Sequence, residues 1–313
     1  MENKIKESIV IGFGSIGQRH ARLLKELGLG VSLVTKRKVS QFQTFTDVGA
    51  ALAAKKADYV IVCNQTFEHY QTLRQLEERS FSGIVLVEKP VFEKVYPSHS
   101  WPFQVVVGYN LRFHPIIKRV ADLVKDKLLY SLHVYCGQYL PSWRKDRDYR
   151  SSYSACQKKG GGVLRDLSHE LDYVTMIAGH WQRLAATGGK VGNLEIDSDD
   201  LFAFLIQTTK CPAVTLQVNY LDLEPRREII LNAYNLSLKA DLIAGTIEWG
   251  NINTRMDKET YPVLPDQTYI DQHTAVLNKD FNRLCSISQA NGILKLIHAS
   301  EEASEKKVWI TNN

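Results

Sequence analysis

The feature that most constrains the fold is a glycine-rich turn directly after the first apolar run. Residues 9–11 read Ile-Val-Ile, residues 12–17 read GFGSIG, and helix-favouring residues follow from Ser15. In a Gly-x-Gly-x-x-Gly turn, the first glycine permits the tight bend, the second admits a pyrophosphate and the third allows close helix–strand packing. The helix N-terminus also favours an anion. This strand–turn–helix context predicts a dinucleotide site; a glycine-rich turn without a ligand is the alternative.

Strands and helices alternate over the first third of the chain. Strands are predicted at 8–11, 31–34, 59–62, 84–87 and 104–107, and helices at 15–27, 48–54 and 67–79. This alternation predicts βαβ units and a doubly wound parallel sheet of the Rossmann type. The link 91–103 contains Pro97 and Pro102 and few helix signals, so we expect a crossover without a helix.

The pattern changes after residue 110. We expect helices at 114–125 and 164–177, a strand at 129–139, and an antiparallel meander of five short strands between 202 and 249. Helices near 271–286 and 292–305 and a strand at 308–310 close the chain. A change from parallel to antiparallel pairing places a domain boundary near residue 110, and a length of 313 residues also favours two domains.

Composition excludes several classes of protein. The net charge is only +5 and acidic residues are interleaved throughout, which argues against nucleic acid as the main partner. The five cysteines form no Cys-x-x-Cys pair, so neither a disulfide framework nor a zinc site is expected. A strand so near the N-terminus leaves no room for a signal peptide, and no apolar run approaches the ~18 residues of a membrane span. We therefore expect a cytoplasmic protein without membrane contact.

The end of the second predicted strand bears on the choice of cofactor. An NAD site expects an acidic residue about 20 residues beyond the glycines, on the ribose 2′-hydroxyl. Here the strand ends in Val34-Thr35-Lys36-Arg37-Lys38, which has a hydroxyl and cations instead, and arginine suits a phosphate. NADP is therefore favoured and NAD is possible, with a solvated turn as the alternative. The predicted cofactor contacts are Gly12, Phe13, Gly14, Ser15, Ile16, Gly17, Thr35, Lys36, Arg37, Asn64, Glu88 and Lys89.

Lys89 follows the apolar run 84–87 in the sequence Glu-Lys-Pro. Proline cannot continue a central strand, so Lys89 is expected at a strand's carboxyl end, where open parallel sheets bind ligands. Its ammonium could donate to a substrate oxygen and stabilise developing alkoxide character. The alternative is a salt bridge to Glu88, which the alternation of side chains along a strand disfavours.

A second polar cluster lies in the sequence GGGVLRDLSHELDY at 160–173. On one helix, residues three and four after Asp166 share its face, which groups Asp166, His169 and Glu170. Histidine suits proton transfer because its unperturbed pKa is ~6.5, so His169 is the first candidate and Glu170 the reserve. A structural role for His169 remains the alternative. A metal site is not expected, because the second histidine of His-Glu-x-x-His is absent.

Aromatic and basic residues between 143 and 153 precede the glycines. Aromatic faces and guanidinium groups suit a sugar ring that bears a carboxylate or phosphate; a charged surface loop is the alternative. The predicted substrate contacts are Lys89, Arg112, Trp143, Arg144, Tyr149, Arg150, Tyr153, Asp166 and His169.

Four stretches together resemble the Gfo/Idh/MocA family of sugar and cyclitol oxidoreductases. They are GFGSIGQRH at 12–20, the LVEKP that ends at Pro90, GYNLRFHP at 108–115, and the glycine-led stretch at 160–173. The resemblance covers nearly the whole chain. It implies a dinucleotide-binding Rossmann domain at 1–110. It also implies an α+β domain at 111–313 for substrate binding, with an open, mostly antiparallel sheet through which homodimers or homotetramers form.

The resemblance also assigns roles to residues. Lys89 matches the family's catalytic lysine and Asp166 its site aspartate, while Glu170 stands where the usual catalytic histidine falls and His169 comes one residue earlier. This Ser-His-Glu sequence resembles a variant in polysaccharide-associated members. The implied activity is NAD(P)-dependent hydride transfer to or from a hydroxyl or keto carbon of a sugar, sugar acid or nucleotide sugar. A non-catalytic dinucleotide-binding regulator, or a redox enzyme that retains its cofactor, is the alternative.

Overall fold

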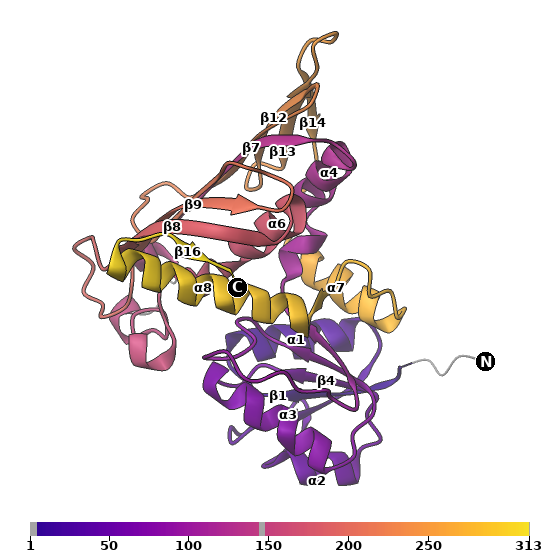
Figure 1. Cartoon of the computed structure of the whole chain (residues 1–313). Helices are drawn as coiled ribbons and strands as arrows, with labels where there is room; N and C mark the ends of the chain where they lie inside the picture. The colour runs from indigo at the N-terminus through magenta and orange to yellow at the C-terminus, as the bar shows by residue number, and fades with distance from the viewer. Residues whose placement is uncertain (1–4, 144–147, 313) are drawn as a thin grey trace. The chain divides into compact units, whose positions relative to one another are not determined.

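The computed structural model describes residues 5–143 and 148–312 (Figure 1). The chain forms two compact units, Met1–Asn110 with Asp266–Leu294, and Leu111–Pro265 with Lys295–Asn313. The predicted domain boundary at residue 110 would place residues 266–294 in the second domain. In the structure this segment packs within the first unit. Each unit is described by itself below.

The first unit is built on a sheet with the strand order β15-β6-β5-β4-β1-β2-β3 among the described residues. Its strands are β1 (Glu7–Ile11), β2 (Gly30–Val34), β3 (Gln43–Phe45), β4 (Tyr59–Val62), β5 (Ile84–Val87), β6 (Gln104–Val107) and β15 (Cys285–Ser286). The pairs are parallel except β15 with β6. The chain starts in the middle and the winding direction reverses between β1 and β4, which is the doubly wound Rossmann arrangement. The predicted fold class of this unit is confirmed.

Helices cover both faces of this sheet. They are α1 (Ser15–Glu26), α2 (Val48–Ala54), α3 (His69–Glu78), α7 (Gln267–Leu277) and the 3-10 helix η1 (Thr66–Glu68). Helices α1 and α7 lie side by side, on the face opposite α2 and α3 (Figure 1). Helix α1 buries Gly17, His20, Ala21, Leu23 and Leu24, the three-to-four-residue spacing of a helix with one buried stripe. Arg19 and Arg22 of α1 pair with Asp266 just before α7.

The crossover from β5 to β6 contains no helix over residues 91–103, as the sequence predicts. Aromatic side chains pack here instead. Tyr96 stacks on Tyr70 of α3 with ring centroids 3.9 Å apart, and Trp101 meets the edge of Tyr70 at 5.7 Å. His99 Nε2 lies 2.9 Å from Glu77 Oε1 on the same helix. Ring contacts and several polar contacts therefore hold this segment against α3.

The second unit is built on a sheet with the order β14-β13-β12-β11-β7-β10-β9-β8-β16 among the described residues. Its strands are β7 (Leu129–Gly137), β8 (Trp181–Gly189), β9 (Leu201–Thr208), β10 (Val214–Asn219), β11 (Arg226–Ala233), β12 (Leu236–Asp241), β13 (Thr246–Gly250), β14 (Asp257–Thr260) and β16 (Ile310–Thr311). Only β7 and β10 pair in parallel; the other pairs are antiparallel. The mostly antiparallel sheet is confirmed, although β7 separates β10 from β11 and the meander is therefore interrupted.

Helices line one face of this second sheet. The helices of this unit are α4 (Pro115–Val124), α5 (Val163–Asp166), α6 (Ser168–Ala178), the end of α8 (Ile287–Lys306), and the 3-10 helices η2 (Asn110–Phe113), η3 (Leu140–Ser142), η4 (Tyr149–Ser151) and η5 (Gln157–Lys159). Helix α6 packs on β7, and α5 on β9 and β10. Along β7 the exposed Tyr130 and His133 alternate with the buried Leu132 and Val134. The opposite face of the sheet is thus left open within the unit.

The prediction of one helix over 164–177 is wrong. Leu167, with φ −96° and ψ 29°, separates α5 from α6. Strands β3, β8, β14 and β15 were also not predicted, and β15 lies within the helix that was expected near 271–286. Strands β3 and β14 have three and four residues, too few for a clear alternation of apolar side chains, and β8 ends in two glycines.

Candidate functional site

The glycine turn at 12–17 has the geometry of an anion cradle. Gly12 has φ +95°, and a Cβ there would lie 2.5 Å from the Asn64 backbone N. A Cβ at Gly17 would lie 2.1 Å from the Gly12 carbonyl oxygen, so neither position admits a side chain. A Cβ at Gly14, in contrast, would meet no described atom within 4 Å, and α1 begins at Ser15 without a side-chain cap. The turn therefore presents open backbone at a helix N-terminus, which suits a pyrophosphate.

Main-chain hydrogen bonds gather three segments at the carboxyl edge of this sheet. The Gly12 N–H donates to the Val34 carbonyl at 3.0 Å, and the Cys63 N–H donates to the Ile11 carbonyl at 2.8 Å. The glycine turn thereby lies between Thr35, which follows β2, and Asn64, which follows β4. This is the switch point at which open α/β sheets bind nucleotides.

The segment after β2 presents cations to solvent. Lys36 and Arg37 are exposed, and the Thr35 hydroxyl accepts a hydrogen bond from the Arg37 N–H at 3.1 Å. No acidic residue occurs between 35 and 42. The structure thus places the predicted hydroxyl and cations beside the strand that adjoins the glycine turn.

Asn64 supplies an acceptor at the same edge. Its amide donates to the Thr72 hydroxyl at 2.9 Å, while its Oδ1 is buried without a hydrogen-bond partner among the described residues. A buried acceptor without a donor is costly and is rare in native proteins. The glycine cradle and this acceptor together fit a bound dinucleotide.

Glu88 and Lys89 follow β5 at the next position along the sheet. Glu88 is 7% exposed, and its Oε1 lies 2.9 Å from His20 Nε2. Its other oxygen accepts the backbone N–H of Lys89 at 3.2 Å. Lys89 itself is half-buried. Glu88, predicted to contact the cofactor, is thus turned toward α1.

In the second unit, Asp166 at the end of α5 meets a residue that sequence reasoning missed. The Tyr220 hydroxyl donates to Asp166 Oδ2 at 2.6 Å, and the Tyr220 side chain is fully buried. Burial and the neighbouring Asp166 carboxylate raise the pKa of Tyr220 well above its ordinary value, so it stays a donor. Trp143 packs edge-on against the same ring at 5.2 Å. The only signal in the sequence was the place of Tyr220 at the end of a predicted strand.

His169 and Glu170 lie in the first turn of α6, and Glu170 is directed into the core. Glu170 is fully buried, and its Oε1 lies 2.9 Å from Arg227 Nε of β11. The Tyr173 hydroxyl donates to the same oxygen at 3.4 Å. Burial acts to lower the pKa of Arg227, but Glu170 together with Cys136 and Tyr173 outweighs this effect, so that pKa is raised. His169, in contrast, is half-buried. Because the helix breaks at Leu167, Asp166 contacts Tyr220 just after β10, whereas Glu170 contacts Arg227 of β11.

Arg112 is also engaged within the second unit. Its side chain is almost fully buried, and its Nε and Nη2 donate to the Asp172 carboxylate at 2.6–3.1 Å. Such a bidentate pair is strong and geometrically fixed. Arg112 was expected to contact the substrate, but its guanidinium group is already paired with Asp172.

The aromatic and basic loop is anchored at several points. Arg144 lies outside the described residues. Arg150 is exposed and pairs with Asp148 and Glu195, and the Tyr149 hydroxyl accepts a hydrogen bond from the Glu195 N–H at 3.2 Å. The Tyr153 hydroxyl donates to the Gly160 carbonyl at 2.6 Å. The indole N–H of Trp143 is buried without a hydrogen-bond partner among the described residues.

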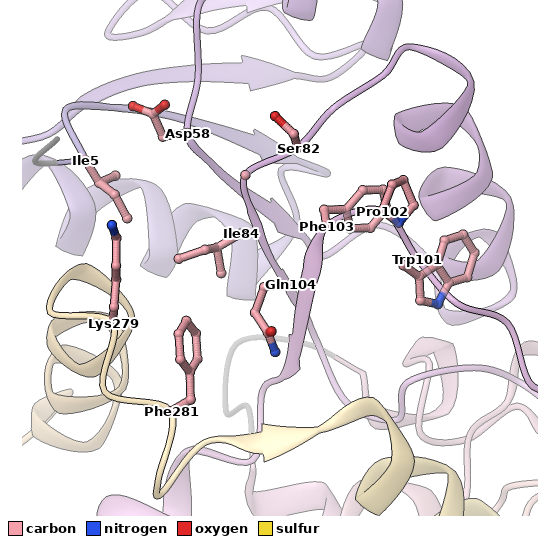
Figure 2. Close-up of a pocket in the computed structure, with 11 residues that line it drawn as sticks. Ile5, Asp58, Ser82, Ile84, Trp101, Pro102, Phe103, Gln104, Lys279 and Phe281 are labelled. Carbon is pink, nitrogen blue, oxygen red and sulfur yellow. The ribbon is translucent and has the colours of Figure 1, made fainter. Parts of the chain in front are cut away.

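One hollow lies away from all these groups. A cavity of about 540 Å³ in the first unit is lined by Asp58, Trp101, Phe103, Lys279 and Phe281, among others. Figure 2 shows these side chains around the amino ends of β5 and β6, near Ile84 and Gln104. Because the glycine turn and Lys89 follow carboxyl ends, this cavity is not part of the candidate site.

Residues 5–143 and 148–312 contain neither a cluster of metal ligands nor a helix that could cross a membrane. No group of three or more His, Cys, Asp or Glu side chains there could hold a metal ion. No helix there combines the length and apolar character needed to cross a bilayer.

Comparison with known proteins identifies the N-terminal part of the chain. Residues 6–97 match the Gfo/Idh/MocA model, described as an oxidoreductase family with an NAD-binding Rossmann fold. Over these residues the chain is similar to the Gfo/Idh/MocA family. The recognition made from the motifs is thereby confirmed for this part of the chain, and the Ser-His-Glu variant stays a prediction. A search of curated proteins found no match.

Solved structures with this fold extend over both units. GenD2 from gentamicin A biosynthesis, solved with NAD, is 17% identical, covers 100% of this chain and 98% of its own, and has a TM-score of 0.80. UDP-N-acetylglucosamine 3-dehydrogenase from Acidithiobacillus ferrooxidans is 17% identical, with coverages of 96% and 98% and a TM-score of 0.79. The transcriptional regulator Gal80p from Kluyveromyces lactis is 13% identical, with coverages of 99% and 91% and a TM-score of 0.80. At such identities the likeness establishes the fold, and the predicted fold class is confirmed.

Proposed function

We propose that this protein is an NADP-dependent oxidoreductase that transfers a hydride between nicotinamide and a hydroxyl or keto carbon of a sugar, sugar acid or nucleotide sugar. One observation carries the proposal: Lys89 follows β5 at the same sheet edge as the glycine cradle, within residues that match an oxidoreductase family. A lysine at that edge can serve cofactor and substrate together.

The cofactor would be held at the carboxyl edge of the first sheet. The main chain of 12–17 would bind the pyrophosphate, and Asn64 Oδ1 would accept from a ligand donor. Thr35, Lys36 and Arg37 suit a 2′-phosphate better than a free ribose hydroxyl. This favours NADP over NAD. Bound nicotinamide supplies hydride chemistry, and the protein supplies position and charge.

Lys89 would donate to the substrate oxygen and stabilise its negative charge during hydride transfer. Asp166, fixed by the Tyr220 hydroxyl, would orient the substrate. For the proton, His169 is the better candidate because Glu170 is fully buried against Arg227. The role of Glu170 is therefore structural in this proposal.

The substrate class rests on the loop chemistry and on related folds. UDP-N-acetylglucosamine 3-dehydrogenase and levoglucosan dehydrogenase are both carbohydrate enzymes with this fold. Trp143 supplies an aromatic face, and its buried indole N–H is available to a ligand oxygen. A role in carbohydrate metabolism, such as polysaccharide biosynthesis, fits these features. Of the arginines predicted to contact substrate, Arg150 is exposed, whereas Asp172 holds Arg112.

The open face of the second sheet would form a homodimer or homotetramer interface. Tyr130, Leu205 and Ile230 are 47%, 43% and 40% exposed on strands of that sheet. Apolar side chains of this size are enriched where protein surfaces associate. None of the five cysteines, all of which lie in the described part of the chain, forms a disulfide, which fits the reducing cytoplasm.

The proposal is tested by a screen of sugars, sugar acids and nucleotide sugars with NADP and with NAD, read at the absorbance of reduced nicotinamide. We expect turnover of at least one carbohydrate, with a lower KM for NADP than for NAD. Absence of turnover across the panel, together with measurable NADPH binding, would instead support a non-catalytic regulator. That reading has one observation in its favour, the shared fold of Gal80p.

A redox enzyme that retains its cofactor is the remaining alternative. Such a protein would keep its nicotinamide cofactor bound through purification. Successive substrates would then reduce and reoxidise that bound cofactor. Nucleotide extracted from protein purified without added cofactor would favour it. Purified protein that is free of nucleotide and releases NADPH into solution would exclude it.

A further inference from the structure

Four polar side chains form a continuous chain through the interior of the first unit. Tyr59 of β4 lies 2.9 Å from His273 Nδ1 of α7, and His273 Nε2 lies 2.9 Å from His20 Nδ1 of α1. His20 Nε2 then lies 2.9 Å from Glu88 Oε1. The first three side chains are fully buried and Glu88 nearly so. Segments far apart in the sequence, including adjacent helices α1 and α7 (Figure 1), thus meet through hydrogen bonds.

The number of hydrogen atoms on these four side chains fixes which group donates and which accepts in each of the hydrogen bonds. Among the described residues, the Tyr59 hydroxyl is hydrogen-bonded only to His273 Nδ1, so it donates its hydrogen to that nitrogen. His273 then carries its hydrogen on Nε2 and donates to His20 Nδ1. His20 in turn donates from Nε2 to the Glu88 carboxylate. Burial lowers the pKa of His273 and raises that of Tyr59, which keeps both neutral. Every hydrogen therefore points toward Glu88.

The chain ends one residue from the proposed catalytic lysine. The second oxygen of Glu88 accepts the backbone N–H of Lys89, so both carboxylate oxygens are engaged. Glu88 can take this position only beside a glycine, because a Cβ at Gly108 would lie 2.6 Å from Oε1. An apolar group in place of the chain would fill the same space without the cost of burying polar atoms. The four hydrogen-bonded side chains therefore fix the orientation of the Glu88 carboxylate, which apolar packing alone would not do.

We propose that His20 is a positioning residue: with His273 and Tyr59 behind it, it holds the Glu88 carboxylate, and through it the main chain of Lys89, in the position that the reaction requires. This inference rests on the proposed function, because it assigns His20 an effect on the turnover that Lys89 supports. His20 touches neither substrate nor cofactor in this role.

Two substitutions at His20 test the contacts of its two ring nitrogens separately. In His20→Gln the side-chain amide can reach Glu88 as Nε2 does, whereas in His20→Asn the shorter amide keeps only the position of Nδ1, toward His273. We expect His20→Gln to stay within about threefold of the wild-type kcat. His20→Asn should lose at least ~10-fold, on the scale of small displacements of catalytic groups. NADPH affinity should be equal in both variants.

The matched control is His114→Asn in the second unit. His114 is also buried, and its Nδ1 accepts the Ile116 N–H at the start of α4, a cap that asparagine retains. We expect wild-type turnover from this variant. Equal kcat values for His20→Asn and His20→Gln, at equal thermal stability, would overturn the positioning role.

A second measurement needs neither substrate nor a variant with activity. Nitrogen-15 NMR of protein labelled at histidine reports which ring nitrogen carries hydrogen. We expect neutral Nε2–H tautomers for His20 and His273, with their signals assigned by the loss of each in His20→Gln and His273→Gln. Hydrogen on Nδ1 of His273 would overturn the inference. The expected tautomers in a protein that oxidises no carbohydrate would overturn the proposed function and the kinetic role, but not the hydrogen-bonded chain.

Discussion

Lys89 and the cations after β2 occupy different parts of one sheet edge, and their expected roles differ accordingly. Lys89 is half-buried and follows a strand of the sheet interior, whereas Lys36 and Arg37 are exposed. A partly buried ammonium acts on charge that develops at a reacting atom, because little water competes with it there. Exposed cations instead contribute to the affinity for an anion, and salt screens that contribution.

Replacement of Lys89 tests the chemical role. We expect Lys89→Ala to lower kcat at least ~100-fold, the usual scale for an acid–base group, with NADPH affinity within a fewfold of wild type. Stopped-flow turnover and NADPH fluorescence titration measure the two quantities. Lys279→Ala, at the exposed cavity on the opposite edge, should change neither. A Lys89→Ala enzyme with wild-type kcat would contradict the assignment.

Replacement of Arg37 tests the choice of cofactor. Arg37→Glu would place a carboxylate where a 2′-phosphate is expected to lie, so we expect KM for NADP to rise at least ~10-fold, or about 1.4 kcal/mol. KM for NAD should stay constant or fall. Lys56→Glu makes the same change of charge after α2 and serves as the control. Equal effects of Arg37→Glu on the two cofactors would argue against a 2′-phosphate site.

At the scale of the element, the break between α5 and α6 determines which partners the polar side chains on either side of it contact. The residues on either side of Leu167 face different neighbours: Asp166 meets Tyr220, and Glu170 meets Arg227. A continuous helix would have grouped these two carboxylates on one face. The break instead leaves Glu170 as one half of a buried ion pair beneath the helix layer.

We expect Glu170→Ala to reduce stability more than chemistry. Removal of Glu170 leaves the largely buried charge of Arg227, whose side chain is 25% exposed, without compensation; loss of one partner of a fully buried pair typically costs about 3–5 kcal/mol, and we expect a loss near the lower end. Urea denaturation measures this loss, and kcat of the folded fraction should stay within a fewfold of wild type. Glu224→Ala, on an exposed loop of the same unit, should change stability by less than about 0.5 kcal/mol. A stable but inactive Glu170→Ala protein would assign the catalytic role to Glu170 after all.

The elements that the sequence predicted well are those with a strong local pattern. The glycine turn, the apolar strands β4 and β5, and helix α2 lie where periodicity placed them. The missing crossover helix was also predicted, because Pro97 and Pro102 oppose a helix. The break at Leu167 was missed because Ser168, His169 and Glu170 carry no helix-breaking signal. Partners such as Tyr220 for Asp166 and Asp172 for Arg112 depend on tertiary packing, which local sequence patterns do not encode.

At the scale of the whole molecule, the first unit is discontinuous in sequence. Asp266–Leu294 supplies α7 and the edge strand β15, which pairs with β6. It also supplies His273, which hydrogen-bonds His20 and Tyr59. Residues 111–265 are therefore an insertion between two parts of one folded unit.

We expect residues 1–110 expressed alone to fold poorly, because one face of their sheet would lack α7 and the polar atoms of His20 and Tyr59 would lose a partner. A polypeptide that joins 1–110 to 266–294 through a flexible linker should regain a cooperative thermal transition and NADPH binding. Near-ultraviolet circular dichroism and fluorescence titration distinguish the two. Cooperative unfolding of 1–110 alone would show that the returning segment is dispensable.

The order of synthesis gives this discontinuity a further consequence. Domains usually fold one after another as the chain leaves the ribosome, with the N-terminal domain first. Here β1 to β6 emerge early, but α7 and β15 are translated only after the whole of 111–265, a delay of roughly 8–30 s at about 5–20 residues per second. The nucleotide-binding unit therefore begins to fold first but can complete its fold only late in synthesis. During that interval β6 is paired with β5 on one side only, and its other edge is open to chaperones or to other nascent chains.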